Sequence, residues 1–283
     1  MNEWTALYLK ELKEHRTVFI FLLAITATTG LISTAAVGWD SPTPSNVFAR
    51  VDEVDHSFSS TFSPYMLWAL FPYIILFILP FLLTHSFAQE IKGQTNYLLL
   101  SLPTSRVTLF LCKIIALMSV GVAVFVMATA ATHVLYLRLI ELAGTLTGMS
   151  VTRIAAPHLW LLVGEIYFGV LFVLLGIASG IAGLRLVIKR FQGLMAALFV
   201  GCVVFLYVGL LSPAREVLKG LVGTYRIPLI EDGGDGAEKL VFSLGWKLPK
   251  SIPSGLDLAI YSVLFGIVLI GLGVFLFHRR AEA

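Results

Sequence analysis

The sequence predicts an all-α, polytopic membrane protein with six transmembrane helices. Its 283 residues are 58% hydrophobic and only 13% charged, whereas soluble domains are about half apolar and about a quarter charged. The mean hydropathy is +0.89, and six separate windows are long and apolar enough for a spanning helix, which needs about 20 such residues. We therefore expect one transmembrane domain, 1–283, with no window left for a soluble catalytic domain.

The windows lie at about 17–38, 65–88, 108–135, 159–183, 194–212 and 257–277. The first could instead be a cleavable signal peptide. However, a mixed-charge segment, 1–16, precedes it, and its apolar core is longer than the usual stretch of about 7–15 residues in a signal peptide. We therefore expect the first window to be a span.

Residues 1–16 are expected to form an amphipathic helix on the membrane surface, followed by a sharp bend into the first span. Trp4, Leu7, Tyr8 and Leu12 recur at helical spacing and form one apolar stripe, the pattern of a helix lying in the interface. The alternative is an ordinary basic tail beside the membrane. Trp4 and Tyr8 favour the interfacial helix, because these aromatic residues are enriched at membrane boundaries.

The distribution of Lys and Arg predicts the orientation, since cytoplasmic segments carry more of them. With both termini on one side, that side carries Lys10, Lys13, Arg16, Lys92, Arg106, Lys113, Arg185, Lys189, Arg190, Arg279 and Arg280. The first two loops on the other side carry Arg50, Arg138 and Arg153. We therefore expect both termini to lie in the cytoplasm, with the protein in the cell membrane.

The connector after the second window, 89–106, has a pattern of its own. Ile91, Leu98, Leu99 and Leu102 share one helical face among polar neighbours, which predicts a helix along the membrane surface. Pro103 cannot continue that helix, and either Thr104 or Ser105 is suited to cap the third span. Arg106 and Lys113 would then lie among lipid headgroups. A surface connector without a partner has the same pattern.

The connector also carries a sequence motif, formed by Glu90, Thr95, Leu99, Leu100, Ser101, Pro103, Ser105, Arg106 and Lys113. With the N-terminal helix and the six windows, this motif resembles the permease subunit of type-2 ABC exporters, in the group of copper-maturation, sodium-export and antibiotic-export permeases. One position departs from the family, because Gln94-Thr95 stands where Gly-Thr is usual and the glycine, Gly93, comes one residue earlier. The shift of this glycine would change the detailed geometry of the contact between the connector and its partner. His85 matches a His or Tyr often found there.

The resemblance implies an ATP-driven exporter of bacterial type, whose connector docks on a separate ATP-binding subunit. The implied ATPase-coupling residues are Glu90, Lys92, Thr95, Leu99, Leu102, Pro103, Ser105 and Arg106. The chain has no phosphate-binding GxxxxGK[ST] loop, so ATP would bind to the partner. We expect no cofactor and no catalytic residue on this chain. Six spans are half of the usual twelve, so a second permease, identical or related, is expected.

Glu165 is the carboxylate deepest within a window, the fourth. Ionisable residues inside membranes often mark transport paths, usually with a partner. His133, Arg138 or Arg153 could reach it, and a structural lock between helices would have the same pattern. Pro72 and Pro80 are predicted to kink the second span. Glu165, His133, Pro72 and Pro80 are therefore the candidate translocation-path residues.

Two further features concern packing and the far side of the membrane. Gly169, Gly176, Gly180 and Gly183 give the fourth span a face of small residues, which predicts close packing within the chain or across a dimer. The segment 213–256 is expected to be an extracytoplasmic loop that opens at Pro213 with a short surface helix. Together with 39–63, this loop could contact an extracytoplasmic partner.

Other classes of protein fit the sequence less well. The net charge is +3, which gives no electrostatic footprint for nucleic acid. Cys112 and Cys202 form no CxxC pair, and HExxH is absent, so a metal or intramembrane enzyme site is not indicated. A secondary carrier or channel usually has internal repeats and more buried ionisable groups. It remains the alternative to the exporter. The substrate is unknown, and a hydrophobic or amphipathic molecule would suit the apolar interior.

Overall fold

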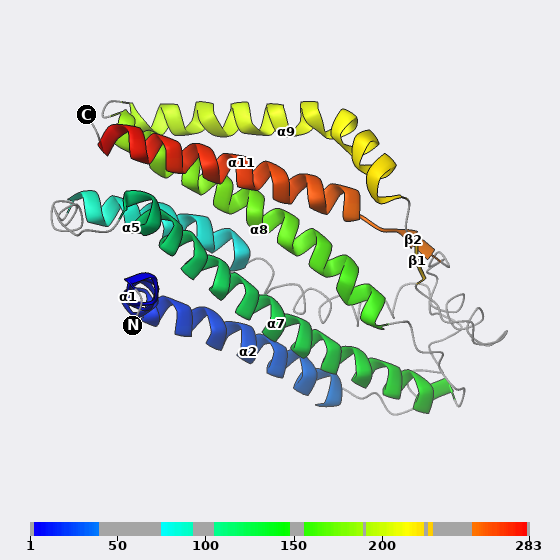
Figure 1. Ribbon diagram of the computed structural model, residues 1–283. Coiled ribbons are helices and arrows are strands. Elements are labelled where there is room, and N and C mark those ends of the chain that lie inside the picture. The colour runs from blue at the N-terminus through cyan, green and yellow to red at the C-terminus, as the bar shows by residue number, and fades with distance from the viewer. Residues whose placement is uncertain are drawn as a thin grey trace.

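The computed structural model in Figure 1 describes residues 3–39, 75–92, 105–147, 156–188, 191–223, 226–228 and 251–281. Within these residues, the α-helices are α1 (Glu3–Glu14), α2 (Arg16–Trp39), α5 (Ile78–Lys92), α7 (Arg106–Thr147), α8 (Ala156–Val187), α9 (Gln192–Val222) and α11 (Leu256–Ala281). A 3-10 turn, η1 (Ile75–Phe77), precedes α5. Two short strands are β1 (Arg226–Pro228) and β2 (Ser251–Pro253).

The expected class, a helical polytopic membrane protein, is confirmed. Among the described residues, four segments are long and apolar enough to cross a membrane: Val107–Ala131 of α7, Val163–Arg185 of α8, Gln192–Val222 (the whole of α9) and Leu256–Arg279 of α11. The bent pair of α1 and α2 would make a fifth span. The apolar part of α5, Ile78–Ala88, is shorter than a span, and residues 65–74 of the predicted second span lie outside the described residues.

The expected bend between the N-terminal helix and the first span is confirmed. The axes of α1 and α2 differ by 67°. His15 lies at the break, and hydrogen bonds from its N–H to Glu11 and from Phe19 to its carbonyl continue the backbone pattern through it. The chain therefore turns from one helix into the other without a loop.

The helices form two groups that lie side by side in Figure 1. One group contains α2 along α7, with α1 across the beginning of α7, and the other contains α8 along α11, with α9 beside α11. Helix α5 packs against both α7 and α8. The fully buried side chains between these helices are mainly large and apolar: Leu22, Leu79, Leu83, Phe110, Leu171 and Leu175.

Small residues bring α8 and α11 into backbone contact. A Cβ atom built on Gly176 would lie 2.8 Å from the Gly266 carbonyl oxygen, and one built on Gly266 would lie 2.5 Å from the Phe172 carbonyl. Gly180 instead faces the ring of Phe199 in α9. The predicted close packing is confirmed for these positions, and it occurs within one chain.

The predicted end of the fifth span, before Pro213, is wrong. Helix α9 continues through that proline to Val222, so the expected short surface helix is its last part. Proline removes one backbone hydrogen bond, but the apolar stripe after it continues the helix. Residues 226–228 then pair antiparallel with residues 251–253. The sequence did not predict this pairing, which brings both ends of the intervening segment together near the start of α11.

Helix α9 is the least buried of the four candidate spans. Only 6% of its apolar window is buried, compared with 56% for that of α8. Its exposed side chains are large and apolar, including Leu198, Phe205 and Leu210. Such a surface is suited to contact with lipid.

Candidate functional site

The predicted coupling segment is described only at its two ends. Glu90 and Lys92 lie in the last turns of α5, and Arg106 is the first residue of α7. The side chains of these three residues are outside the description. Thr95, Leu99, Leu102 and Pro103, together with residues 93–104 as a whole, lie outside the described residues. The expectations for the docking face therefore stay predictions.

Ser105 caps the start of α7, as one of the two alternatives predicted. Its Oγ accepts a hydrogen bond from the Thr108 N–H at 3.1 Å and lies 2.6 Å from the Thr108 hydroxyl oxygen. This geometry satisfies one of the N–H groups that have no partner within the helix. The cap fixes the point at which the connector enters α7.

Lys113 does not lie among lipid headgroups, contrary to the prediction. Its Nζ donates to Glu11 Oε2 at 2.8 Å and to Ser86 Oγ at 2.9 Å. The side chains of Lys113 and Glu11 are only 4% and 7% exposed. We call Glu11, Ser86 and Lys113 the Lys113 cluster. The prediction was wrong because Glu11, 102 residues earlier in the sequence, supplies a buried counter-charge that the local pattern of α7 cannot reveal.

The N-terminal helix turns its stripe toward the protein. Tyr8 donates a hydrogen bond to Ser119 Oγ in α7 at 2.9 Å, and Leu12 packs against the buried core. Glu11 lies on the same side and is buried. Lys10 and Lys13 are exposed. The apolar stripe of α1 thus forms a contact with α7, in addition to any contact with the membrane, and this contact is centred on an ion pair.

His15 borders the Lys113 cluster at the bend between α1 and α2. Burial lowers the pKa of His15 below its ordinary value, and the positive charge of Lys113 acts in the same direction, against Glu14 and Glu11. A lowered pKa keeps this imidazole neutral at pH 7. A neutral imidazole adds no second positive charge beside Lys113.

Aromatic rings surround the cluster and connect it to the last helix. The Phe87 and Phe110 rings stack with centroids 4.8 Å apart, and Phe277 of α11 lies 5.3 Å from Phe110. The Lys113 ammonium lies 5.6 Å from the centre of the Phe87 ring, within the range of a cation–π interaction. Low polarity around the ion pair strengthens its electrostatic attraction.

Glu165 lies in α8, and among the described residues none of its three candidate partners makes a hydrogen bond to its carboxylate. Trp160 donates its indole N–H to His133 Nδ1 at 3.1 Å. Neither oxygen of the buried Glu165 carboxylate makes a hydrogen bond within the described parts of the chain. The Gly255 amide lies beside the carboxylate without forming a good hydrogen bond, and Asp257 is close enough to interact electrostatically. The side chains of Arg138 and Arg153 lie outside the described residues.

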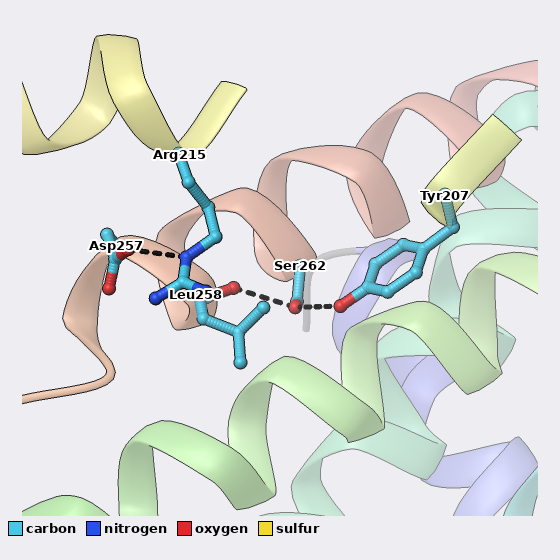
Figure 2. A network of polar contacts seen from close by, with 5 residues as sticks. All are labelled: Tyr207, Arg215, Asp257, Leu258 and Ser262. Carbon is cyan, nitrogen blue, oxygen red and sulfur yellow. Dashed lines mark hydrogen bonds and ion pairs between the residues drawn. The ribbon is translucent and has the colours of Figure 1, made fainter. Parts of the chain in front are cut away.

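A second polar group, missed by the sequence reasoning, joins α9 to α11 near Glu165. Arg215 donates from Nε to Asp257 Oδ2 at 2.7 Å. Ser262 donates to the Leu258 carbonyl at 2.7 Å, and its Oγ lies 2.8 Å from the Tyr207 hydroxyl oxygen. Figure 2 shows these contacts between the two helices. We call Tyr207, Arg215, Asp257 and Ser262 the Asp257 cluster. Asp257 lies in the first turn of α11, and an acidic residue at a helix start is the one signal that could have indicated it.

The two prolines of the candidate path are described unequally. Pro72 lies outside the described residues. Pro80 is the third residue of α5, directly after the 3-10 turn, and not in the interior of a long helix as predicted. A proline in the first turn removes no needed α-helical hydrogen bond. The kink expected in the second span stays a prediction, because residues 65–74 lie outside the described residues.

Comparisons with models of protein families, with curated proteins and with solved structures found no match for this chain.

Proposed function

We propose that this chain is the permease subunit of an ATP-driven ABC exporter, which binds a separate ATP-binding subunit through residues 89–106. The observation that carries the proposal is the position of the two helix ends that flank the connector. The end of α5 and the start of α7 lie at the same end of the bundle as α1 and the marked N- and C-termini (Figure 1). The connector is predicted to expose Glu90 and Lys92 for ionic contacts while its leucine face holds it against the spans, and such a segment beside the amphipathic helix α1 is suited to receive a protein partner.

The basic residues support the assignment of this end to the cytoplasm, where an ATPase would be found. The exposed Lys10 and Lys13 of α1 lie there, and the connector ends carry Lys92 and Arg106. Cytoplasmic segments are enriched in such residues. On this proposal, ATP binds and is hydrolysed on the partner, and two permease copies, identical or related, form the path through a bacterial cell membrane.

The direct test is purification of the tagged chain from its native membrane in mild detergent, followed by identification of bound proteins and an ATPase assay. We expect an ATP-binding subunit with a phosphate-binding loop, and vanadate-sensitive hydrolysis of ATP. A chain that purifies without any ATP-binding protein, after cross-linking as well as without it, would contradict the proposal.

One observation favours a second candidate, a secondary carrier. The Glu165 carboxylate is buried within the membrane helix α8 and has no hydrogen-bond partner among the described residues. Intramembrane carboxylates of this kind serve as proton or cation sites in carriers. Reconstituted vesicles separate the two candidates, because a carrier depends on an ion gradient and an exporter depends on ATP.

A further inference from the structure

The Lys113 cluster joins the three elements that surround the proposed coupling segment. Glu11 comes from α1, Ser86 from α5 and Lys113 from α7. Ser86 lies about two turns before the end of α5, and Lys113 lies about two turns after the start of α7. The cluster is therefore at a similar distance from both ends of residues 93–104. About two turns of helix therefore join each flanking helix end to the cluster.

A second contact fixes the angle of α1 against α7. Tyr8 bonds to Ser119, while Glu11 bonds to Lys113. The two attachment points on α7 are separated by about 9 Å along its axis, at 1.5 Å per residue. One contact alone would allow α1 to rotate about it. Two contacts hold α1 and the start of α7 together as one unit.

Stability alone does not account for a buried ion pair at this position. Removing two charges from water costs about as much as their attraction returns, and well-packed apolar residues often replace such a pair without loss of stability. The surroundings are apolar, with Phe87 and Phe110 beside the pair. Apolar contacts are not directional, whereas the hydrogen bonds of Lys113 specify one relative position of α1, α5 and α7.

We propose that Lys113 is a positioning residue that binds α1 and α5 to the start of α7, so that movement of the docked connector is transmitted to the membrane helices. This inference rests on the proposed function. On this inference, α1 holds the helix ends beside the connector in a fixed position relative to α7. Loss of the directional contacts would leave the ATPase bound and active while the membrane helices no longer follow it.

The test compares three versions of the complete complex with its ATP-binding subunit. Glu11→Leu/Lys113→Met removes both charges and leaves no unpaired charge behind, Glu11→Lys/Lys113→Glu reverses the pair, and Lys10→Met/Lys13→Met removes two exposed charges from α1 as a control. Spin labels report the distance between α7 and α9. One is attached to the exposed native Cys202 and one to Val126→Cys, which is also exposed, with the buried Cys112 replaced by Ala.

The wild-type complex and the control are expected to change this distance when ATP is trapped with vanadate. In the apolar double variant, we expect the ATPase to be retained and to hydrolyse ATP, while the shifted population falls by roughly fivefold or more. Reversal of the pair should restore part of the change. An apolar variant with an unchanged distance response would overturn the inference, as would a wild type without a response. Absence of the ATPase from the wild type would instead overturn the proposed function.

Ser86→Ala provides the milder variant if either double variant fails to fold. It removes one acceptor of Lys113 and leaves the ion pair in place. A smaller distance response with an intact complex would support the inference. A full response in Ser86→Ala, with Glu11 and Lys113 variants unable to fold, would show that the cluster serves folding only and would overturn it.

Discussion

Arg215 and Asp257 connect the last part of α9, beyond Pro213, to the first turn of α11. The Arg215 Nε lies 2.7 Å from Asp257 Oδ2, and the side chain of Asp257 is only 7% exposed while that of Arg215 is 38% exposed. Asp257 also gains from its place at the positive end of the α11 dipole. This pair fixes the direction of α9 after the proline, where a backbone hydrogen bond is missing.

Replacement of Arg215 by Met should destabilise the protein by about 1–3 kcal/mol, because it leaves the buried Asp257 carboxylate without its main partner. The loss should be below that of a fully buried pair, since Arg215 is partly in solvent. Glu216→Gln is the matched control, because Glu216 is exposed on the same helix. Unfolding in detergent measures both variants, and equal losses would contradict the importance of the pair.

Replacement of Glu165 by Gln should leave stability unchanged or raise it. The carboxylate is buried and has no hydrogen-bond partner among the described residues, so a neutral amide removes the cost of a buried charge. A structural lock between helices would give the opposite result, a clear loss of stability. Thermal unfolding of the wild type, Glu165→Gln and Glu165→Ala distinguishes the two.

Replacement of Gly266 by Ala should separate α8 from α11. The added methyl group would lie 2.5 Å from the Phe172 carbonyl in the facing backbone, and overpacking of this kind costs about 1–3 kcal/mol. Gly271 is the control, because a Cβ there would meet no heavy atom of another helix within 4 Å. The prediction fails if Gly266→Ala and Gly271→Ala unfold at the same temperature.

Replacement of Ser105 by Ala should cost about 0.5–2 kcal/mol, through loss of the cap on the Thr108 N–H. Ser105→Asp should keep most of the stability, because Asp is also a good cap and its charge suits a helix start. If the Asp variant is as unstable as the Ala variant, the capping bond does not stabilise α7. Amide hydrogen exchange in the first turn of α7 reports this directly.

Local patterns predicted those features that depend on neighbouring residues. Hydrophobic windows indicated the helices, because an apolar run of this length has no other stable form in a bilayer. Ser105 was predicted as one of two caps, since capping involves residues only three apart. The small face of α8 likewise predicted close packing, although not that α11 supplies the facing surface.

Features that depend on distant residues were missed. The position of Lys113 near a span end predicts contact with lipid headgroups, whereas the fold brings Glu11 to it. Pairing of His133 with Glu165 was one prediction, because both lie near the same end of their helices. The sequence does not reveal how each helix is rotated about its axis, and His133 accepts a hydrogen bond from Trp160. Pro213 predicted the end of a helix, whereas α9 continues through it.

Docking of the ATP-binding subunit on residues 89–106 is best tested by co-purification of that subunit with connector variants. Glu90→Lys changes a predicted ionic contact with the subunit, and Leu99→Asp/Leu102→Asp changes the leucine face that is predicted to hold the connector against the spans. Leu221→Asp is the control, because Leu221 is an exposed residue at the end of α9. We expect both connector variants to lose the subunit, or its stimulation by the permease, and the wild type and Leu221→Asp to keep it. Retention of a fully coupled ATPase by both connector variants would contradict it.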